Sequence, residues 1–257
     1  MRVAYLILYL SFFTGCNTND NEKESTRLTN ESKTFLQNNK FDEAQIVIEK
    51  AIRLDPNNYA AYNNRAYLKI KQNKPSEDVL ADLKKALEIK PNYEIALYSL
   101  ANYYFEIKDY DKTIQNVNVY LKYAATENFD TKLKEHIYGI SAESKYMKKD
   151  FDNAIIDIKA ALALDSTYAA AHKILGDCYF YKNSVELAIK EFTIAIGLDS
   201  NYYQSYLARA RSYESSKIPA LLNLAEQDYR SAFKINPAAE DIYETNSPLF
   251  KKIKQTK

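Results

Sequence analysis

Residues 169–202 read AAAHKILGDCYFYKNSVELAIKEFTIAIGLDSNY, and this stretch decides the fold. Both of its halves are helical in pattern, and each carries a small residue, Gly176 in the first and Ala188 in the second. Small residues let two antiparallel helices approach closely, because a larger side chain would clash across the pair. Phe192 follows Ala188 by one turn and is large enough to fill the space between the helices. The stretch therefore predicts a tightly packed pair of helices.

The end of this helix pair recurs along the chain. An alanine and an apolar residue lead into Asp, Asn, Pro or Ser at 51–57 (AIRLDPN), 86–92 (ALEIKPN), 161–166 (ALALDS), 195–200 (AIGLDS) and 232–237 (AFKINP). The alanines are 35, 75, 34 and 37 residues apart, and the gap of 75 holds one more copy, with Tyr120 in the place of the alanine. Pro or Ser after the last apolar residue stops a helix. The chain is therefore a series of similar helical units.

Other positions repeat with the same period. The second helices open with an aromatic and an acidic residue, as at Phe41-Asp42, Tyr110-Asp111 and Phe151-Asp152, where the acid can accept amide hydrogens. The small position of the first helix is occupied by Ala66, Ala101, Ala142, Gly176 and Ala210. That of the second is occupied by Ala44, Ala154, Ala188 and Ala225, and the filling residues are Ile48, Leu83, Val117, Ile158, Phe192 and Tyr229.

This unit resembles the tetratricopeptide repeat, a helix–turn–helix of 34 residues. Residues 169–202 match the family pattern with Leu175, Gly176, Tyr179, Ala188, Phe192 and Ala195. The resemblance covers residues 25–239, with repeats at 25–58, 59–93, 94–127, 135–168, 169–202 and 203–239. It implies an all-α, right-handed superhelical solenoid of about six helix pairs. Residues 240–257 are expected to form a capping helix, broken or restarted at Pro248, and a basic tail, because a terminal repeat must be shielded.

The N-terminal segment is expected to be an export signal. In residues 1–15, Arg2 precedes an apolar run of roughly 11 residues, which suits a signal peptide and is too short for a bilayer span. Residues 13–16 (FTGC) resemble the lipobox of bacterial lipoproteins, although Phe13 stands where Leu is usual. The resemblance implies lipidation of Cys16, a polar tether over 16–24, and a place on a bacterial membrane, with the outer membrane favoured. An ordinary secretory signal or a buried N-terminal helix is the alternative.

Composition excludes several classes of function. Lys and Arg total 35 against 34 Asp and Glu, so no basic excess favours nucleic acid. Four glycines in the chain leave no phosphate-binding Gly-rich loop, and His136 and His172 have no metal-ligand spacing nearby. We therefore expect no enzyme, no cofactor and no metal. Cys178 is expected to be a buried small hydrophobic residue.

The family resemblance also indicates which residues face a partner. In such solenoids, positions 2, 5, 9, 12 and 13 of each repeat line a concave groove. The groove residues predicted here are Asn63, Tyr67, Tyr98, Asn102, Phe105, Tyr146, Lys173, Asp177, Phe180, Tyr181 and Arg211, and Glu143 and Leu207 occupy further positions of the same kind. Tyr and Phe give a large contact area at low entropic cost. The carboxylate clamp of chaperone-adaptor members is absent, because only Asn64 fits it.

We therefore expect a membrane-tethered interaction module of the bacterial cell envelope, a scaffold that binds a partner peptide or protein in an aromatic-rich groove. The alternative is a lipoprotein that binds glycans or other ligands for outer-membrane uptake. Lipoproteins of that kind are much longer, and this chain has no Trp to stack on a sugar ring. A third possibility, a cytoplasmic co-chaperone, fails if the export signal is real.

Overall fold

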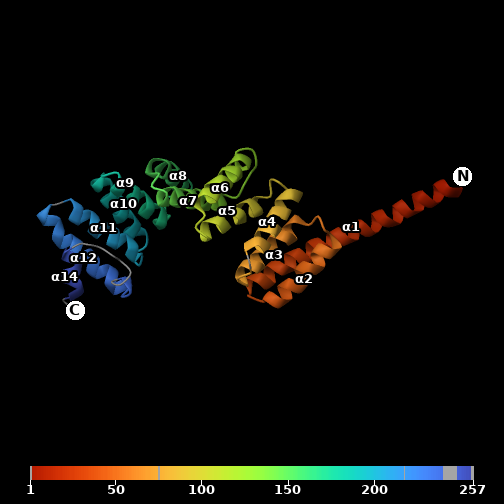
Figure 1. Ribbon diagram of the computed structural model, residues 1–257, viewed down its shortest axis with the longest axis horizontal. Helices are drawn as coiled ribbons and strands as arrows, with labels where there is room; N and C mark the ends of the chain where they lie inside the picture. Colours follow the sequence, from red (N-terminus) through yellow and green to blue (C-terminus); the bar gives the residue numbers. More distant parts are fainter. Residues whose placement is uncertain (1, 75, 217, 240–247, 256–257) are drawn as a thin grey trace. The chain divides into compact units, whose positions relative to one another are not determined.

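The predicted all-α fold is confirmed by a computed structural model, which describes residues 2–74, 76–216, 218–239 and 248–255 (Figure 1). These residues contain helices and turns and no strand. The helices are α1 (Arg2–Gln37), α2 (Phe41–Leu54), α3 (Tyr59–Lys71), α4 (Ser76–Ile89), α5 (Glu94–Glu106), α6 (Tyr110–Ala124), α7 (Thr131–Met147), α8 (Phe151–Leu164), α9 (Ala169–Tyr181), α10 (Val185–Leu198), α11 (Tyr203–Ser215), α12 (Pro219–Ile235) and α14 (Pro248–Gln255).

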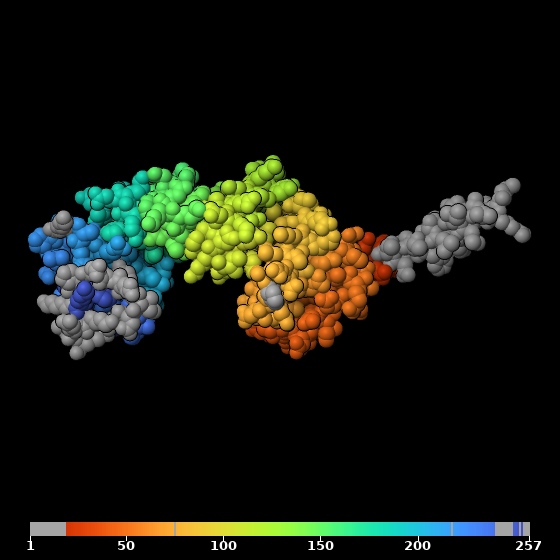
Figure 2. Space-filling view, in the orientation of Figure 1, coloured from red at the N-terminus to blue at the C-terminus, as the bar shows by residue number. Residues whose placement is uncertain are grey.

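The chain divides into two compact units, Met1–Tyr103 and Tyr104–Lys257. In the first unit α1 packs on α2 and α3 packs on α4, while α3 also touches α1 and α2. In the second unit the pairs α7–α8, α9–α10 and α11–α12 stack in chain order, and each second helix touches the next first helix. In Figure 2 these pairs, coloured from green to blue, pack against one another and form a continuous surface. The first helices α7, α9 and α11 also touch in succession, so they share one side of the unit.

Close approach of the helices within a pair depends on the small residues that the sequence indicates. Ala44, Ala154 and Ala188 are fully buried in the second helices. A Cβ atom added to Gly176 on α9 would lie 2.6 Å from Cε1 of Phe192 on α10, closer than carbon atoms can approach. The aromatic ring thus occupies the space that the missing side chain leaves.

The recurring Asp after the last apolar residue forms a local turn. Asp165 has an extended backbone, donates its N–H to the carbonyl of Ala161, and accepts the N–H of Thr167 on Oδ1 at 2.8 Å. Asp55 and Asp199 accept the N–H two residues later in the same way, each at 2.9 Å. This side-chain turn explains why four of the five quoted endings carry Asp or Asn at this position, the exception being Lys90.

The acids at the starts of the second helices act differently from the prediction. Asp109 and Asp150, each one residue before its helix, accept the amide hydrogens of the first turn. Asp111 and Asp152 instead form ion pairs with Lys148 and Lys182, which end the first helices of the following repeats. The capping oxygen belongs before the helix, because the first-turn N–H groups point back toward it.

Helix α1 is longer than the first helix predicted for the repeat at 25–58. It is continuous from Arg2 to Gln37, so residues 16–24, predicted as a tether, are helical. Ser25 on α1 accepts a hydrogen bond from Nδ2 of Asn58 at 2.7 Å and donates to the carbonyl of Ala51 at 2.8 Å. Within the described residues, no helix has the length and apolar character needed to span a bilayer.

The predicted capping helix is present as α14, which packs on α12. Phe250 is buried between the rings of Tyr229 and Phe233, with centroids 5.3 Å from each. Residues 240–247 and 256–257 of the predicted cap and tail lie outside the described residues. Helix α14 begins at Pro248, which fits the restart expected there, because proline suits the first turn of a helix.

Candidate functional site

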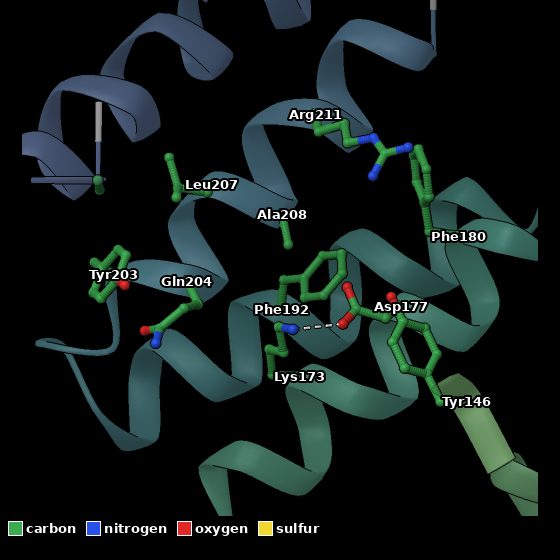
Figure 3. A pocket seen from close by; sticks show the side chains of 11 residues that line it. Tyr146, Lys173, Asp177, Phe180, Phe192, Tyr203, Gln204, Leu207, Ala208 and Arg211 are labelled. Carbon is green, nitrogen blue, oxygen red and sulfur yellow. Dashed lines mark ion pairs between the residues drawn. The ribbon is translucent and has the colours of Figure 1, made fainter. Parts of the chain in front are cut away.

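A cavity of about 270 Å³ lies beside α9 in the second unit (Figure 3). Its walls come from the first helices α7, α9 and α11, with one residue from α10 and one that follows α12. The lining residues are Tyr146, Lys173, Asp177, Phe180, Phe192, Tyr203, Gln204, Leu207, Ala208, Arg211 and Ala239. We call this feature the α9 cavity. Since three consecutive first helices build it, it belongs to the side of the unit that these helices share.

Aromatic rings line the α9 cavity, and further rings pack against them. The rings of Phe151 and Tyr181 are stacked with centroids 5.3 Å apart and planes at 3°. Tyr146 packs against both rings, at 5.9 Å and 6.0 Å. The guanidinium of Arg211 lies over the ring of Phe180, 4.5 Å from its centroid, as Figure 3 shows. Stacked rings and a cation over a ring hold these side chains in fixed positions while Tyr181 stays 48% exposed.

An ion pair lies within the α9 cavity. Nζ of Lys173 is 2.7 Å from Oδ2 of Asp177, one turn further along α9. Burial raises the pKa of Asp177, and the charges of Lys173 and Arg211 offset only part of that effect. Burial is the largest influence on Lys173 and would lower its pKa, but the charge and hydrogen bond of Asp177, together with the charges of Tyr202 and Glu143, raise it by more in sum. Burial, followed by the charge of Asp177, also raises the pKa of Tyr146. Lys173 therefore stays charged, and Tyr146 keeps its hydroxyl proton as a hydrogen-bond donor.

The structure brings together six of the predicted groove residues. Tyr146, Lys173, Asp177, Phe180 and Arg211 line the α9 cavity, and Tyr181 contacts two of them through its ring and Arg211 through a hydrogen bond of 3.4 Å. Their side chains come from three consecutive repeats, on α7, α9 and α11. Their role in binding a partner stays a prediction.

The other five predicted residues lie elsewhere. Phe105 is half-buried, with its ring 6.5 Å from that of Tyr110. In the first unit, Tyr67 is 44% exposed with the Lys71 ammonium over its ring, and Tyr98 and Asn102 are half-buried. Asn63 is only 6% exposed, so it offers little surface to a partner. Oδ1 of Asn63 accepts no hydrogen bond from the described residues.

Sequence reasoning missed part of the cavity wall. Gln204 stands at position 2 of its repeat, which the family pattern already marks, so position alone could have found it. Tyr203 begins the same repeat, and Phe192 was assigned only to filling the space between helices. Ala239 follows α12 and reaches the cavity through the packing of the last pair, for which the sequence carries no local signal.

Other reactive groups form no second site within the described residues. No cluster of His, Cys, Asp and Glu there could hold a metal ion. Cys178 on α9 is buried, and burial raises the pKa of its thiol to about 12, with the charge of Asp177 adding to the effect. A thiol of this kind is inert at neutral pH. The side chain of Cys16 lies outside the described residues.

Models of the tetratricopeptide repeat match residues 27–58, 47–78 and 142–203. Anaphase-promoting complex subunit 3 of Schizosaccharomyces pombe is 26% identical over 169 residues, which cover 63% of this chain and 23% of that protein. DnaJ protein P58IPK homolog B of Oryza sativa subsp. japonica is 20% identical over 219 residues, covering 77% and 45%. The chain thus spans less than half the length of these curated relatives.

Solved structures share the fold. The structure of Pseudomonas aeruginosa pilF has a TM-score of 0.70 and 14% identity, over 93% of this chain and all of that chain. PilW, described as a widely conserved type IV pilus biogenesis factor, has a TM-score of 0.68 and 15% identity, over 89% and 97%. YrrB, described as a TPR protein with an unusual peptide-binding site, has a TM-score of 0.62 and 18% identity, over 81% and 97%.

The fold and the α9 cavity define a helical-repeat protein in whose second unit the first helices α7, α9 and α11 share one side. The matching repeat models support its place in the tetratricopeptide-repeat family, as the recurring pattern predicts. These models describe a repeat and indicate no catalytic family.

Proposed function

We propose that the chain is a protein–protein interaction module that holds a peptide or a segment of a partner protein in the α9 cavity and along the adjoining faces of α7, α9 and α11. The observation that carries this proposal is that three consecutive first helices place aromatic rings and a buried ion pair around one cavity. A concave, mostly apolar site with a few polar groups is the usual form of a binding site. Tyr and Arg are also enriched among the few residues that supply most of the binding energy at protein interfaces.

The similar proteins support a function in binding other proteins or peptides. YrrB is described as having a peptide-binding site, and the similar fission-yeast protein is named as a subunit of a complex. A site built from side chains of several repeats suits an extended or helical segment, which can contact several first helices at once.

The proposal includes a membrane tether. The signal-like residues 1–15 and the lipobox-like FTGC at 13–16 support acylation of Cys16 and a place on a bacterial membrane, the outer membrane being our choice. Residues 16–37 of helix α1 would then connect the acylated Cys16 directly to the first repeat, because the helix is continuous through them. Several acyl chains hold a protein on a membrane much more firmly than one.

Site-specific photo-crosslinking in cells tests the binding surface. The aromatic crosslinker p-benzoyl-phenylalanine replaces Tyr181, which is 48% exposed and contacts residues that line the cavity, or Ile156, which is 64% exposed on the second helix α8. A discrete protein adduct is expected from position 181 and none from 156. Adding Phe180→Ser should remove the adduct, because it removes a wall of the cavity. Equal adducts at both positions, or none at 181, would contradict the proposed surface.

Metabolic labelling tests the tether separately. Cells expressing the full chain are fed an alkyne-bearing palmitate analogue, and the label on the purified protein is compared with that on Cys16→Ser. The label and membrane sedimentation are both expected for the unaltered chain and should both be lost with Cys16→Ser. An unlabelled chain that still sediments with membranes would contradict acylation, whatever the outcome at position 181.

A further inference from the structure

Glu143 on α7 is a half-buried carboxylate to which no described residue gives a hydrogen bond or an ion pair. Its electrostatic neighbours are Lys173 and Asp177 on α9, Glu106 at the end of α5 and Tyr202, which precedes α11. Tyr146 lies three residues later on the same face of α7 and lines the α9 cavity. Glu143 therefore lies beside the cavity, on the side of the unit that the first helices share.

The charges around Glu143 do not balance. Glu106, Glu143 and Asp177 contribute three carboxylates, and the cations among these groups are Lys173 and Arg211. Lys173 is already bound to Asp177 at 2.7 Å. Arg211 lies on α11, where its guanidinium covers the ring of Phe180. The end of the cavity nearest α7 is thus left with an excess of negative charge.

Holding Glu143 in this place has an energetic cost. Burial raises its pKa, and although Lys173 lowers it, Asp177 and Glu106 raise it further. A carboxylate removed from water without a partner destabilises the folded chain, and such groups are typical of sites where a ligand supplies the partner.

We propose that the segment bound in the α9 cavity carries an arginine or lysine whose charged group pairs with Glu143 while its methylene groups lie on the ring of Tyr146. This inference rests on the proposed function, and it assigns the chemistry of the bound segment. A basic side chain has both the cation that Glu143 lacks and an apolar stem that suits an aromatic wall. An acidic side chain would meet Glu143 and Glu106, and a purely apolar one would cover Glu143 and leave it without a partner.

Defined peptide libraries test the inference on the full 257-residue chain. The probes are acetylated and amidated fluorescent nonapeptide mixtures, random except for a central residue fixed as Arg, Lys, norleucine or Glu. Fluorescence polarisation is expected to show that the Arg and Lys mixtures bind the unaltered chain most tightly. Glu143→Gln should weaken these two about tenfold, the effect of losing one charge-assisted hydrogen bond, and leave the norleucine mixture unchanged.

Glu186→Gln is the matched control, because Glu186 is an exposed acid on the second helix α10. It should bind every mixture as the unaltered chain does. A preference for norleucine or Glu, or equal loss with both Gln variants, would overturn the basic occupant and leave peptide binding in place. Binding of no mixture, or binding that Phe180→Ser leaves unchanged, would overturn both the basic occupant and the proposed groove.

Discussion

Arg209 on α11 and Asp228 on α12 are joined by two parallel hydrogen bonds, from Nε to Oδ2 and from Nη2 to Oδ1, each 2.8 Å long. In the first unit Arg65 on α3 binds Asp82 on α4 in the same way, at 3.0 Å and 2.7 Å. Asp228 and Asp82 are 5% and 3% exposed. The two repeats therefore use one charge-assisted bridge to fix the second helix on the first, and its fork geometry requires Arg.

Replacing one partner of this bridge should lower the free energy of unfolding more than replacing both partners. Arg209→Met leaves Asp228 buried without its partner, so the free energy of unfolding is expected to fall by about 3 kcal/mol. The double variant with Asp228→Leu removes the buried charge as well and should recover most of that loss. Urea denaturation followed by circular dichroism measures both variants. A double variant as unstable as the single one would show that packing, and not charge, dominates at this bridge.

The two glycines in the helix pair α9–α10 should respond to alanine in opposite directions. A methyl group on Gly176 would lie 2.6 Å from the ring of Phe192, so Gly176→Ala is expected to destabilise the chain by about 1 to 3 kcal/mol. A methyl group on Gly197 would meet no atom within 4 Å, and Gly197→Ala should stabilise the chain by up to about 1 kcal/mol through helix propensity. Thermal unfolding of the two variants checks this difference in sign. Equal effects would mean that α10 shifts to make room at Gly176.

The repeated pairs could be predicted because each depends on a local rule with a fixed period. Gly176 and Ala188 are small where helices cross, and Asp165 ends its helix through its own neighbours. The length of α1 could not be predicted, because its continuation through the signal-like segment has no cap or breaker to mark a boundary. The buried hydrogen bond between Ser25 and Asn58 could not be predicted either, because it joins residues 33 positions apart.

The candidate site could be predicted only in part. Tyr146, Phe180 and Arg211 stand at positions that the repeat pattern turns toward a shared surface, and the structure brings them to one cavity. The burial of Asn63 depends on how closely neighbouring helices pack around it. Its position within the repeat does not indicate that packing. The unpaired state of Glu143 likewise follows from which side chains of α5 and α9 reach it.

Among the described residues, five turns between first and second helices contain a residue with a left-handed backbone, and two of these residues are lysines. Lys149 has φ 63° and Lys108 has φ 61°, whereas Asn39, Asn73 and Asn183 occupy the equivalent places. Lys149→Gly should raise the free energy of unfolding by about 0.5 to 1 kcal/mol, because glycine adopts this conformation without a steric penalty. Asn183→Ala should lower it by a similar amount. Melting temperatures test both, and a loss of stability with Lys149→Gly would contradict the strain assigned to that turn.

Cys178 should behave as a thiol that is protected by folding. Its pKa is raised to about 12, mainly by burial, so in a Cys16→Ser background it should not react with Ellman's reagent at about pH 8 until the chain is unfolded. The thiol of the unfolded chain loses its proton at about pH 8.5. Between that pH and the pKa of the folded chain, the unfolded state therefore binds fewer protons than the folded state. The free energy of unfolding must then fall as the pH rises through this window, and Cys178→Ala should make that fall less steep. Rapid labelling of the folded chain, or an unchanged slope with Cys178→Ala, would show that the thiol reaches solvent.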